Sequence, residues 1–504
     1  MELRAGSLLH KVETSSATPA VGPSDVLFGL GPRSRADVVR VLWPAGILQA
    51  ETEVPAAVAP SSAAVMSIAE LDRKPSSCPF LYTWNGTRFE FVTDFMGGGE
   101  MGAWSAPGAH DRPDSDEYVR IGQEQLQMRN GRYDLRVTNE LEEALFVDRL
   151  QLVGVAHPAG VDVYPNEGLR SSGRRQPFAL YTVRAPHAPR RAIDEHGHDV
   201  LDQIARIDRR YVDDFRLEPI RGYAQEHAVT LQVDLGAARR LLLLLTGWTD
   251  YAFSSDNVAA HQAGLRSKPP AVQLRDGSGV WQTVVPEIGL PVGRPQTIVV
   301  DLTRALAGRS PGAVEVRIVT TLRVYWDRML VDTSEPAPFS IERIDPRDAA
   351  LRWRGFSAET TPDGAEPFGY DYERVSTGAP WKTMPGQYTR TGDVVPLLSA
   401  IDDQFVVSAP GDEIALSFDG TALGALPAGW TRTYLLYADG FSKEMNLHSS
   451  SPDRLEPLPF HGMSRYPYPP PEHYPATPAH DRYRATYNTR IIGGPIPPLL
   501  AAPF

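Results

Sequence analysis

Aromatic residues and carboxylates that could bind a sugar gather in the middle third of the chain. Aromatic rings stack on the C–H faces of sugars, while neighbouring carboxylates and amides take the hydroxyls. The candidates are Trp248, Asp250, Tyr251, Asp256, Asn257, Trp326 and Asp327, with Asp256 and Asn257 expected in a loop. Trp248 follows an apolar run and is expected to be partly exposed, whereas Trp326 alternates with Val324 and is expected in the core. A purely structural role in a sandwich core is the alternative for both tryptophans.

A second candidate is the acidic loop from Asp111 to Glu117, whose carboxylates could bind a hard cation. Asp114, Asp116 and Glu117 offer the oxygen ligands that Ca²⁺ prefers. The loop lacks the glycine at the sixth position and the glutamate at the twelfth position of an EF-hand. Two interpretations therefore stay open, a calcium site and a solvated acidic loop.

Three other motifs carry weaker signals. Glu195-His-Gly-His198 can supply two metal ligands, but no third ligand follows at a known spacing. The glycine-rich run from Asp94 to Gly102 lacks the Gly-Lys-Ser/Thr ending of a phosphate loop, which indicates a plain connection. The single cysteine, Cys78, excludes an internal disulfide, and its apolar neighbours favour a buried, inert thiol.

Composition indicates a mainly β protein of several domains. The 504 residues predict about three domains, and 45 prolines with 42 glycines indicate many turns. The formal net charge of −12, without a basic stripe, argues against a nucleic-acid partner. No apolar run is long enough to span a membrane, and residues 1–11 lack the pattern of a signal peptide.

The strand pattern from 191 to 340 predicts an antiparallel β-sandwich of jelly-roll type. His227 to Asp234 alternates with period two, and Leu241 to Leu245 is apolar throughout, as expected for a central strand covered on both faces. In outline this region resembles the jelly-roll modules of the galactose-binding type. One amphipathic helix is expected near 199–214, lying on a sheet.

The remainder of the chain divides into four parts. We expect a β domain at 1–56, a linker at 57–75, a β-rich domain at 76–190 and a carboxy-terminal β region at 341–504. Asn85-Gly86 predicts a hairpin with a type I′ turn. Past Pro457 the chain becomes rich in proline and tyrosine, and we expect this tail to dock on the protein surface.

The amino-terminal part resembles a known family. Phe28-Gly-Leu-Gly31, followed by Val38-Val-Arg-Val-Leu-Trp-Pro-Ala-Gly-Ile-Leu-Gln49, is similar to the ASPIC/UnbV domain. The resemblance implies an extracellular, periplasmic or cell-envelope location and association with a β-propeller of FG-GAP or VCBS repeats, which this sequence does not contain. It also implies that the chain is a fragment or is split from its propeller, and it supplies no catalytic residues.

Two functions from different classes follow. The first is a non-catalytic binding or assembly module that attaches to a glycan or a protein surface. The second is a glycan-acting hydrolase with a carboxylate pair such as Asp250 and Asp327, which needs carboxyl groups ~5 Å apart for retention or ~6.5–9.5 Å apart for inversion. The binding module is favoured because the sequence carries no catalytic signature.

Overall fold

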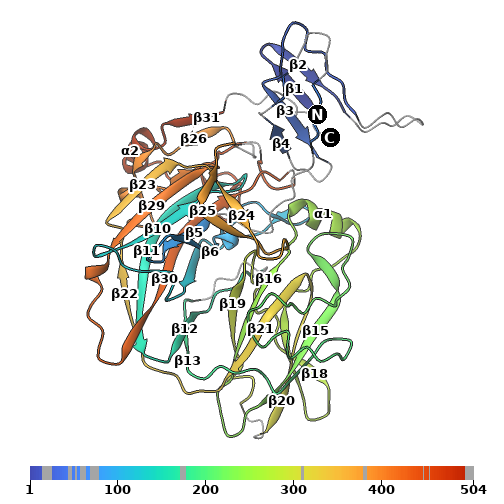
Figure 1. The fold of residues 1–504 in the computed structure, drawn as a ribbon, viewed down its shortest axis with the longest axis vertical. Coiled ribbons are helices and arrows are strands. Elements are labelled where there is room, and N and C mark those ends of the chain that lie inside the picture. Colours follow the sequence, from blue (N-terminus) through green and yellow to red (C-terminus); the bar gives the residue numbers. More distant parts are fainter. Residues whose placement is uncertain are drawn as a thin grey trace, which may run out of the picture.

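The computed structural model describes residues 1–13, 25–43, 48–51, 54–56, 64–68, 79–170, 177–307, 312–378, 383–446, 448–452 and 454–493. Over these residues the chain is mainly antiparallel β-sheet, as predicted, and forms a small amino-terminal sheet and two β-sandwiches (Figure 1). The described part contains two α-helices, α1 (Ser254–Gln262) and α2 (Pro478–Thr486). Cys78 and most of the predicted linker lie outside the described residues.

The amino-terminal sheet has a small core of its own. It consists of β1 (Glu2–Ala5), β2 (Leu8–Lys11), β3 (Val38–Leu42) and β4 (Leu48–Glu51), in the order β2-β1-β3-β4. Leu3, Val39 and Val41 are buried between its strands and the neighbouring loops. The alternation of apolar residues in β3 thus places one face of the sheet inward. The turn expected at 44–46 lies outside the described residues.

The jelly roll is a sandwich of a five-stranded and a three-stranded sheet. Its strands are β14 (Arg191–Ile193), β15 (Tyr223–Asp234), β16 (Leu242–Thr249), β17 (Ala271–Arg275), β18 (Trp281–Val285), β19 (Gln296–Asp301), β20 (Ala313–Leu322) and β21 (Val324–Asp332). The sheet orders are β14-β15-β20-β17-β18 and β19-β16-β21. Every residue of β16 is buried, which confirms the prediction of a central strand from its run of leucines.

The larger sandwich is assembled from two stretches of chain on either side of the jelly roll. Its strands are β5 (Phe80–Trp84), β6 (Phe89–Asp94), β9 (Asp116–Ile121), β10 (Arg132–Thr138), β11 (Ala144–Pro158), β22 (Ser340–Ile344), β23 (Asp348–Trp353), β27 (Gly392–Asp393), β28 (Val406–Ser408), β29 (Asp412–Asp419) and β30 (Trp430–Lys443). The sheet orders are β27-β23-β29-β10-β5-β6 and β22-β11-β30-β9, with β28 on β11. The predicted division between 76–190 and 341–504 is therefore corrected, because both ranges contribute strands to each sheet.

Short elements complete the fold. They are β7 (Trp104–Ala106), β8 (Ala109–His110), β12 (Asp162–Pro165), β13 (Leu180–Val183), β24 (Phe356–Thr360), β25 (Gly369–Ser376), β26 (Gly386–Tyr388), β31 (Arg490–Ile492), and the 3₁₀ turns η1 (Gly97–Gly99), η2 (Val395–Leu397) and η3 (Gly420–Ala422). The proline- and tyrosine-rich tail docks as expected, since Leu455, Met463 and Tyr466 are buried in one core cluster with residues of β11 and β30.

The helix predicted near 199–214 is wrong. Ile204 and Val212 do point into the core of the jelly roll, but the segment consists of turns and isolated bridges. The N–H of Met329 donates to the carbonyl of Ile204 at 2.9 Å, and the N–H of Val212 donates to the carbonyl of Trp326 at 3.1 Å. These backbone groups bond to the edge of β21, so they are not available for a helical ladder.

The two Asn-Gly pairs make different turns. Asn85 and Gly86 do form a hairpin between β5 and β6, but the predicted type I′ turn is wrong. Asn85 Oδ1 accepts the N–H of Arg88 at 2.9 Å, and only the glycine of this pair has a positive φ, of 100°. Asn130 and Gly131 have φ of 50° and 76°, which is the pattern of a type I′ turn.

Candidate functional site

An acidic pocket lies where the jelly roll meets the larger sandwich. Its charged lining residues are Arg112, Asp114, Asp116, Glu117, Glu167 and Arg170, and its other lining residues are Phe95, Gly97, Gly98, Tyr118, Asn166, Gly168, Leu169, Phe178, Val292 and Gln296. The three residues predicted to bind calcium therefore line one pocket, together with a fourth carboxylate, Glu167, that the prediction missed. Four carboxylates against two guanidinium groups favour a cationic ligand.

The glycine-rich run after β6 brings the backbone close to the acidic loop. The N–H of Asp114 donates to the carbonyl of Gly98 at 2.6 Å. A Cβ atom added to Gly99 would lie 2.9 Å from the carbonyl oxygen of Gly440, closer than such contacts occur. These glycines therefore allow close packing of the connection beneath the pocket, as expected for a connection and not for a phosphate loop.

Glu117 and Glu167 are anchored by backbone donors. Glu117 Oε2 accepts the N–H of Met96 at 2.6 Å, and Glu167 Oε1 accepts the N–H of Tyr118 at 3.0 Å. Both side chains are half-buried, so solvent reaches them through the pocket. Each carboxylate is held in place by one oxygen, and its second oxygen accepts no hydrogen bond from the described part of the chain.

The electrostatics of the pocket oppose the ionised form of both glutamates. Burial, together with repulsion by neighbouring aspartates, raises the pKa of Glu117 to about 7, although the N–H of Met96 acts in the opposite direction. Burial also raises the pKa of Glu167 well above its usual range, and the carboxylate of Glu117 adds to this shift. A cation in the pocket would stabilise the ionised form of both glutamates and so lower the pKa of each.

An aromatic wall closes one side of the pocket. The rings of Tyr118 and Phe178 stack with centroids 3.8 Å apart. The guanidinium of Arg343 lies 5.2 Å from the centre of the Tyr118 ring and donates to its hydroxyl at 2.9 Å. These contacts hold the two rings in place.

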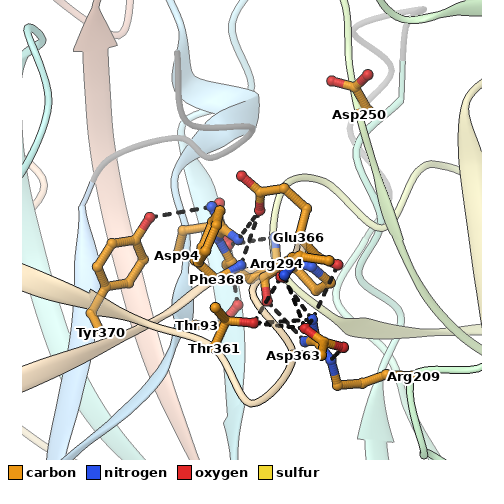
Figure 2. A network of polar contacts seen from close by, with 12 residues as sticks. Thr93, Asp94, Arg209, Asp250, Arg294, Thr361, Asp363, Glu366, Phe368 and Tyr370 are labelled. Atoms are coloured by element: carbon orange, nitrogen blue, oxygen red, sulfur yellow. Dashed lines mark hydrogen bonds and ion pairs between the residues drawn. The ribbon is translucent and has the colours of Figure 1, made fainter. Parts of the chain in front are cut away.

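A buried arginine holds the jelly roll against the larger sandwich beside the pocket (Figure 2). Arg294, 1% exposed, lies between the pocket residues Val292 and Gln296. Its backbone N–H donates to Asp94 Oδ1 at 3.1 Å. Its guanidinium pairs with Glu366 at 2.9 Å and donates to the hydroxyl of Tyr370 at 3.2 Å. Arg294 therefore links the pocket segment of the jelly roll to β6 and to the β24–β25 hairpin of the larger sandwich.

A second arginine strengthens the same joint from the jelly roll side (Figure 2). Arg209 makes two hydrogen bonds to Asp363, at 2.8 and 2.9 Å, and donates to the carbonyls of Ala365 and Pro367. Its N–H and that of Asp208 each donate to Asp327 Oδ1 at 3.1 Å. Asp327, predicted to bind a ligand, thus holds the turn that presents Arg209.

The two tryptophans proposed for a sugar platform are both buried. Trp326 is 2% exposed and packs in the core of the jelly roll, which confirms its predicted position. Trp248 is 6% exposed, so the expected partial exposure is wrong. Its indole stacks on Tyr325 with ring centroids 4.6 Å apart, because Trp248 lies opposite Tyr325 in the register of β16 and β21. Neither ring offers a face to a sugar in this arrangement.

The remaining predicted binding residues near the tryptophans have local structural partners. Asp250 pairs with Arg221 at 2.7 Å and with Arg323 at 2.9 Å. Asp256 and Asn257 lie in helix α1 and not in a loop: Asp256 Oδ2 accepts the N–H of Phe253, and Asn257 Oδ1 accepts the hydroxyl of Tyr223. The ring of Tyr251 contacts that of Phe253, with centroids 4.9 Å apart.

Metal-ligand geometry within the described residues occurs away from the pocket. Side-chain ligand atoms converge within 4.8 Å in two groups, Asp148 with Asp403 and His461, and Asp194 with His198 and Asp214. The carboxylates of the acidic pocket are not one of these groups. Calcium at Asp114, Asp116 and Glu117 therefore stays a prediction.

Comparisons with protein-family models, with curated proteins and with solved structures give no match to this chain. Among the described residues no helix has the length and apolar character needed to cross a membrane.

Proposed function

We propose that this chain is a binding and assembly module, and that the acidic pocket receives a lysine or arginine side chain of a partner protein. One observation carries the proposal: four carboxylates line a single half-open pocket, and burial and mutual repulsion raise the pKa of two of them. A basic side chain supplies the missing positive charge. It does not require the carboxylates to converge on one point, as a metal ion does.

The walls of the pocket suit the stem of such a side chain as well as its charge. Tyr118, Phe178 and Phe95 line the pocket beside the carboxylates. Lysine and arginine pack their methylene stems on apolar surfaces, and guanidinium groups stack on aromatic rings. A cation that is partly desolvated next to an aromatic ring gains about 0.5–2 kcal/mol from that contact.

The resemblance of the amino-terminal sheet to the ASPIC/UnbV domain extends the proposal to the setting of the protein. An extracellular or cell-envelope location and a partner that carries a β-propeller are what this resemblance implies. The basic side chain would then belong to a propeller surface or to another chain at the same site.

Ligand-observed saturation-transfer NMR tests the pocket with defined probes. The capped peptides Gly-Arg-Gly and Gly-Lys-Gly are expected to bind wild-type protein weakly, in the millimolar range of about −4 kcal/mol, and Gly-Gln-Gly is expected not to bind. Glu117→Gln and Asp114→Asn should weaken binding at least tenfold. Glu124→Gln, which changes an exposed glutamate outside the pocket, is the matched control and should bind like wild type.

The competing outcomes are distinct. Binding of both basic peptides that is unaffected by Glu117→Gln would place their site elsewhere and overturn the assignment. Saturable Ca²⁺ binding at the pocket without peptide binding would overturn it in favour of the calcium prediction.

The raised pKa of Glu117 favours one second candidate, the glycan-acting hydrolase. Asp250 pairs with two arginines, and Asp327 accepts two backbone N–H groups, so both carboxylates already have structural partners. The general acid of such a hydrolase would instead be Glu117, whose pKa of about 7 leaves it half protonated near neutral pH. Turnover of aryl glycosides by wild type, lost in Glu117→Gln and independent of basic peptides, would support this candidate over the first.

A further inference from the structure

His461, in the docked tail, is surrounded by three aspartates from the larger sandwich. Its Nε2 lies 2.6 Å from Asp439 Oδ1, on β30. Its Nδ1 lies 2.7 Å from Asp403 Oδ1 and 3.6 Å from Asp148 Oδ2, on β11. These residues are far apart in sequence, so the cluster exists only in the folded protein.

The two ring nitrogens of His461 have different surroundings. Asp439 is buried, takes one nitrogen and is itself held by the hydroxyl of Ser115 at 3.2 Å. A metal-bound histidine typically donates its other N–H to such a carboxylate, which fixes the ring orientation. The opposite nitrogen then converges with Asp148 and Asp403, and the three ligand atoms all lie within 4.8 Å of one another.

Asp148 is a fully buried carboxylate whose two oxygens have different surroundings. Its side chain is 0% exposed, and Oδ2 accepts the N–H groups of Asp402 and Asp403 at 3.1 and 3.0 Å. Its other oxygen, Oδ1, is buried and has no hydrogen-bond partner among the described residues. A buried carboxylate oxygen without a partner is costly, and an ion or a water commonly accounts for it.

The charge of the cluster calls for a cation. Three carboxylates face one imidazole, so even a protonated ring leaves an excess of negative charge in a largely buried place. The mixture of one nitrogen and two oxygens suits Zn²⁺ and neighbouring divalent transition ions, whereas Ca²⁺ and Mg²⁺ prefer oxygen alone.

We propose that Asp148, Asp403 and His461 form a binding site for a divalent transition metal ion such as Zn²⁺, with Asp439 as the outer carboxylate that orients the imidazole. The metal joins the tail to β11 and to the loop at 402–405, and so secures the cluster of Leu455, Met463 and Tyr466 on the larger sandwich. This site is separate from the acidic pocket and does not depend on the proposed function.

The test measures Zn²⁺ on the full chain after chelation, by isothermal titration. Wild type is expected to bind one ion tightly. Asp148→Asn and His461→Gln should weaken that site at least 100-fold, and Asp439→Asn, by loss of the orienting carboxylate, about 10-fold. His198→Gln removes the exposed histidine of the other cluster and should leave the tight site intact. Glu117→Gln should also leave it intact.

The variants Asp148→Asn, His461→Gln and Asp439→Asn test the site only if they fold. A second measurement therefore uses a protein in which these three residues are unchanged. X-ray absorption of Zn²⁺ bound to the His198→Gln protein should show a first shell of one nitrogen-type and two or more oxygen-type ligands at about 2.0–2.2 Å, with a single imidazole. Two or more imidazoles in that shell, or tight binding unchanged in Asp148→Asn, would overturn the assignment. Failure of wild type to bind Zn²⁺ or Mn²⁺ would leave His461 as a protonated clamp and refute the metal site.

Discussion

Replacing Glu117 with glutamine is expected to stabilise the ligand-free protein at pH 8 and to change it little at pH 5. The reason is that the pKa of Glu117 is about 7 in the folded protein, against 4.5 for an ordinary glutamate. The folded state therefore binds more protons than the unfolded chain between these values. The contribution of the neutral Glu117 carboxyl group to stability is therefore complete below about pH 4.5 and is lost as the pH rises through about 7. Glutamine is neutral throughout and does not suffer this loss.

The size of the effect follows from the same two values. The difference between about 7 and 4.5 corresponds to roughly 3 kcal/mol at pH 8 and to less than about 1 kcal/mol at pH 5. Because water reaches Glu117 through the pocket, we expect about 1–3 kcal/mol at pH 8. For a unit of 150–250 residues this is a rise in melting temperature of about 2–12 °C.

Thermal unfolding of wild type and Glu117→Gln at both pH values checks this prediction, with Glu124→Gln as the exposed control. The glutamine still accepts the N–H of Met96, so the anchoring hydrogen bond is conserved. A lower melting temperature for Glu117→Gln than for wild type at pH 8 would refute the reasoning. It would mean that the ionised carboxylate is stabilised by the folded protein and not opposed by it.

Three further substitutions test the packing of the jelly roll and its joint with the larger sandwich. Trp248→Ala and Trp326→Ala should each destabilise the protein by about 3–5 kcal/mol, as expected for large buried aromatic residues, and differential scanning calorimetry should show similar losses for both. A Trp248→Ala protein with unchanged melting and lost retention on a glycan column would instead restore Trp248 as a binding residue. Arg294→Ala should lower the free energy of unfolding by about 3–5 kcal/mol, because it leaves the partners of the arginine unpaired. The loss should lie near the lower value, because Glu366 is partly exposed to water. A double-mutant cycle with Glu366→Gln that gives no coupling would contradict the role assigned to this pair.

The features that the sequence predicted correctly are those set by residues adjacent in the chain. The leucine run gave the central strand β16, because only a strand covered on both faces carries no polar side. The acidic loop at Asp114 to Glu117 indicated the pocket, because its carboxylates are adjacent in sequence. Glu167 was missed, since it lies in an unremarkable loop after β12 and reaches the pocket only through the fold.

Long-range pairing caused the principal errors. The apolar spacing at 199–214 is genuine, and its residues do face the core, but backbone bonds to β21 prevent a helix there. Trp248 is covered by Tyr325, a ring on a strand formed much later in the chain. The sequence also could not predict that residues 76–190 and 341–504 contribute strands to the same sheets, because no local pattern specifies that β10 pairs with β29.

The interleaved larger sandwich sets an order of events during synthesis. β11 pairs with β30 along its whole length, from Ala144 with Lys443 to Pro158 with Trp430, and the entire jelly roll is translated between them. At roughly 5–20 residues per second, the long apolar β11 emerges on the order of ten seconds to a minute before its partner. The jelly roll has all of its own strands within that interval and can close first. Until β30 is synthesised, β11 of the larger sandwich lacks its partner strand and has an unpaired edge, where a chaperone or a neighbouring nascent chain can bind.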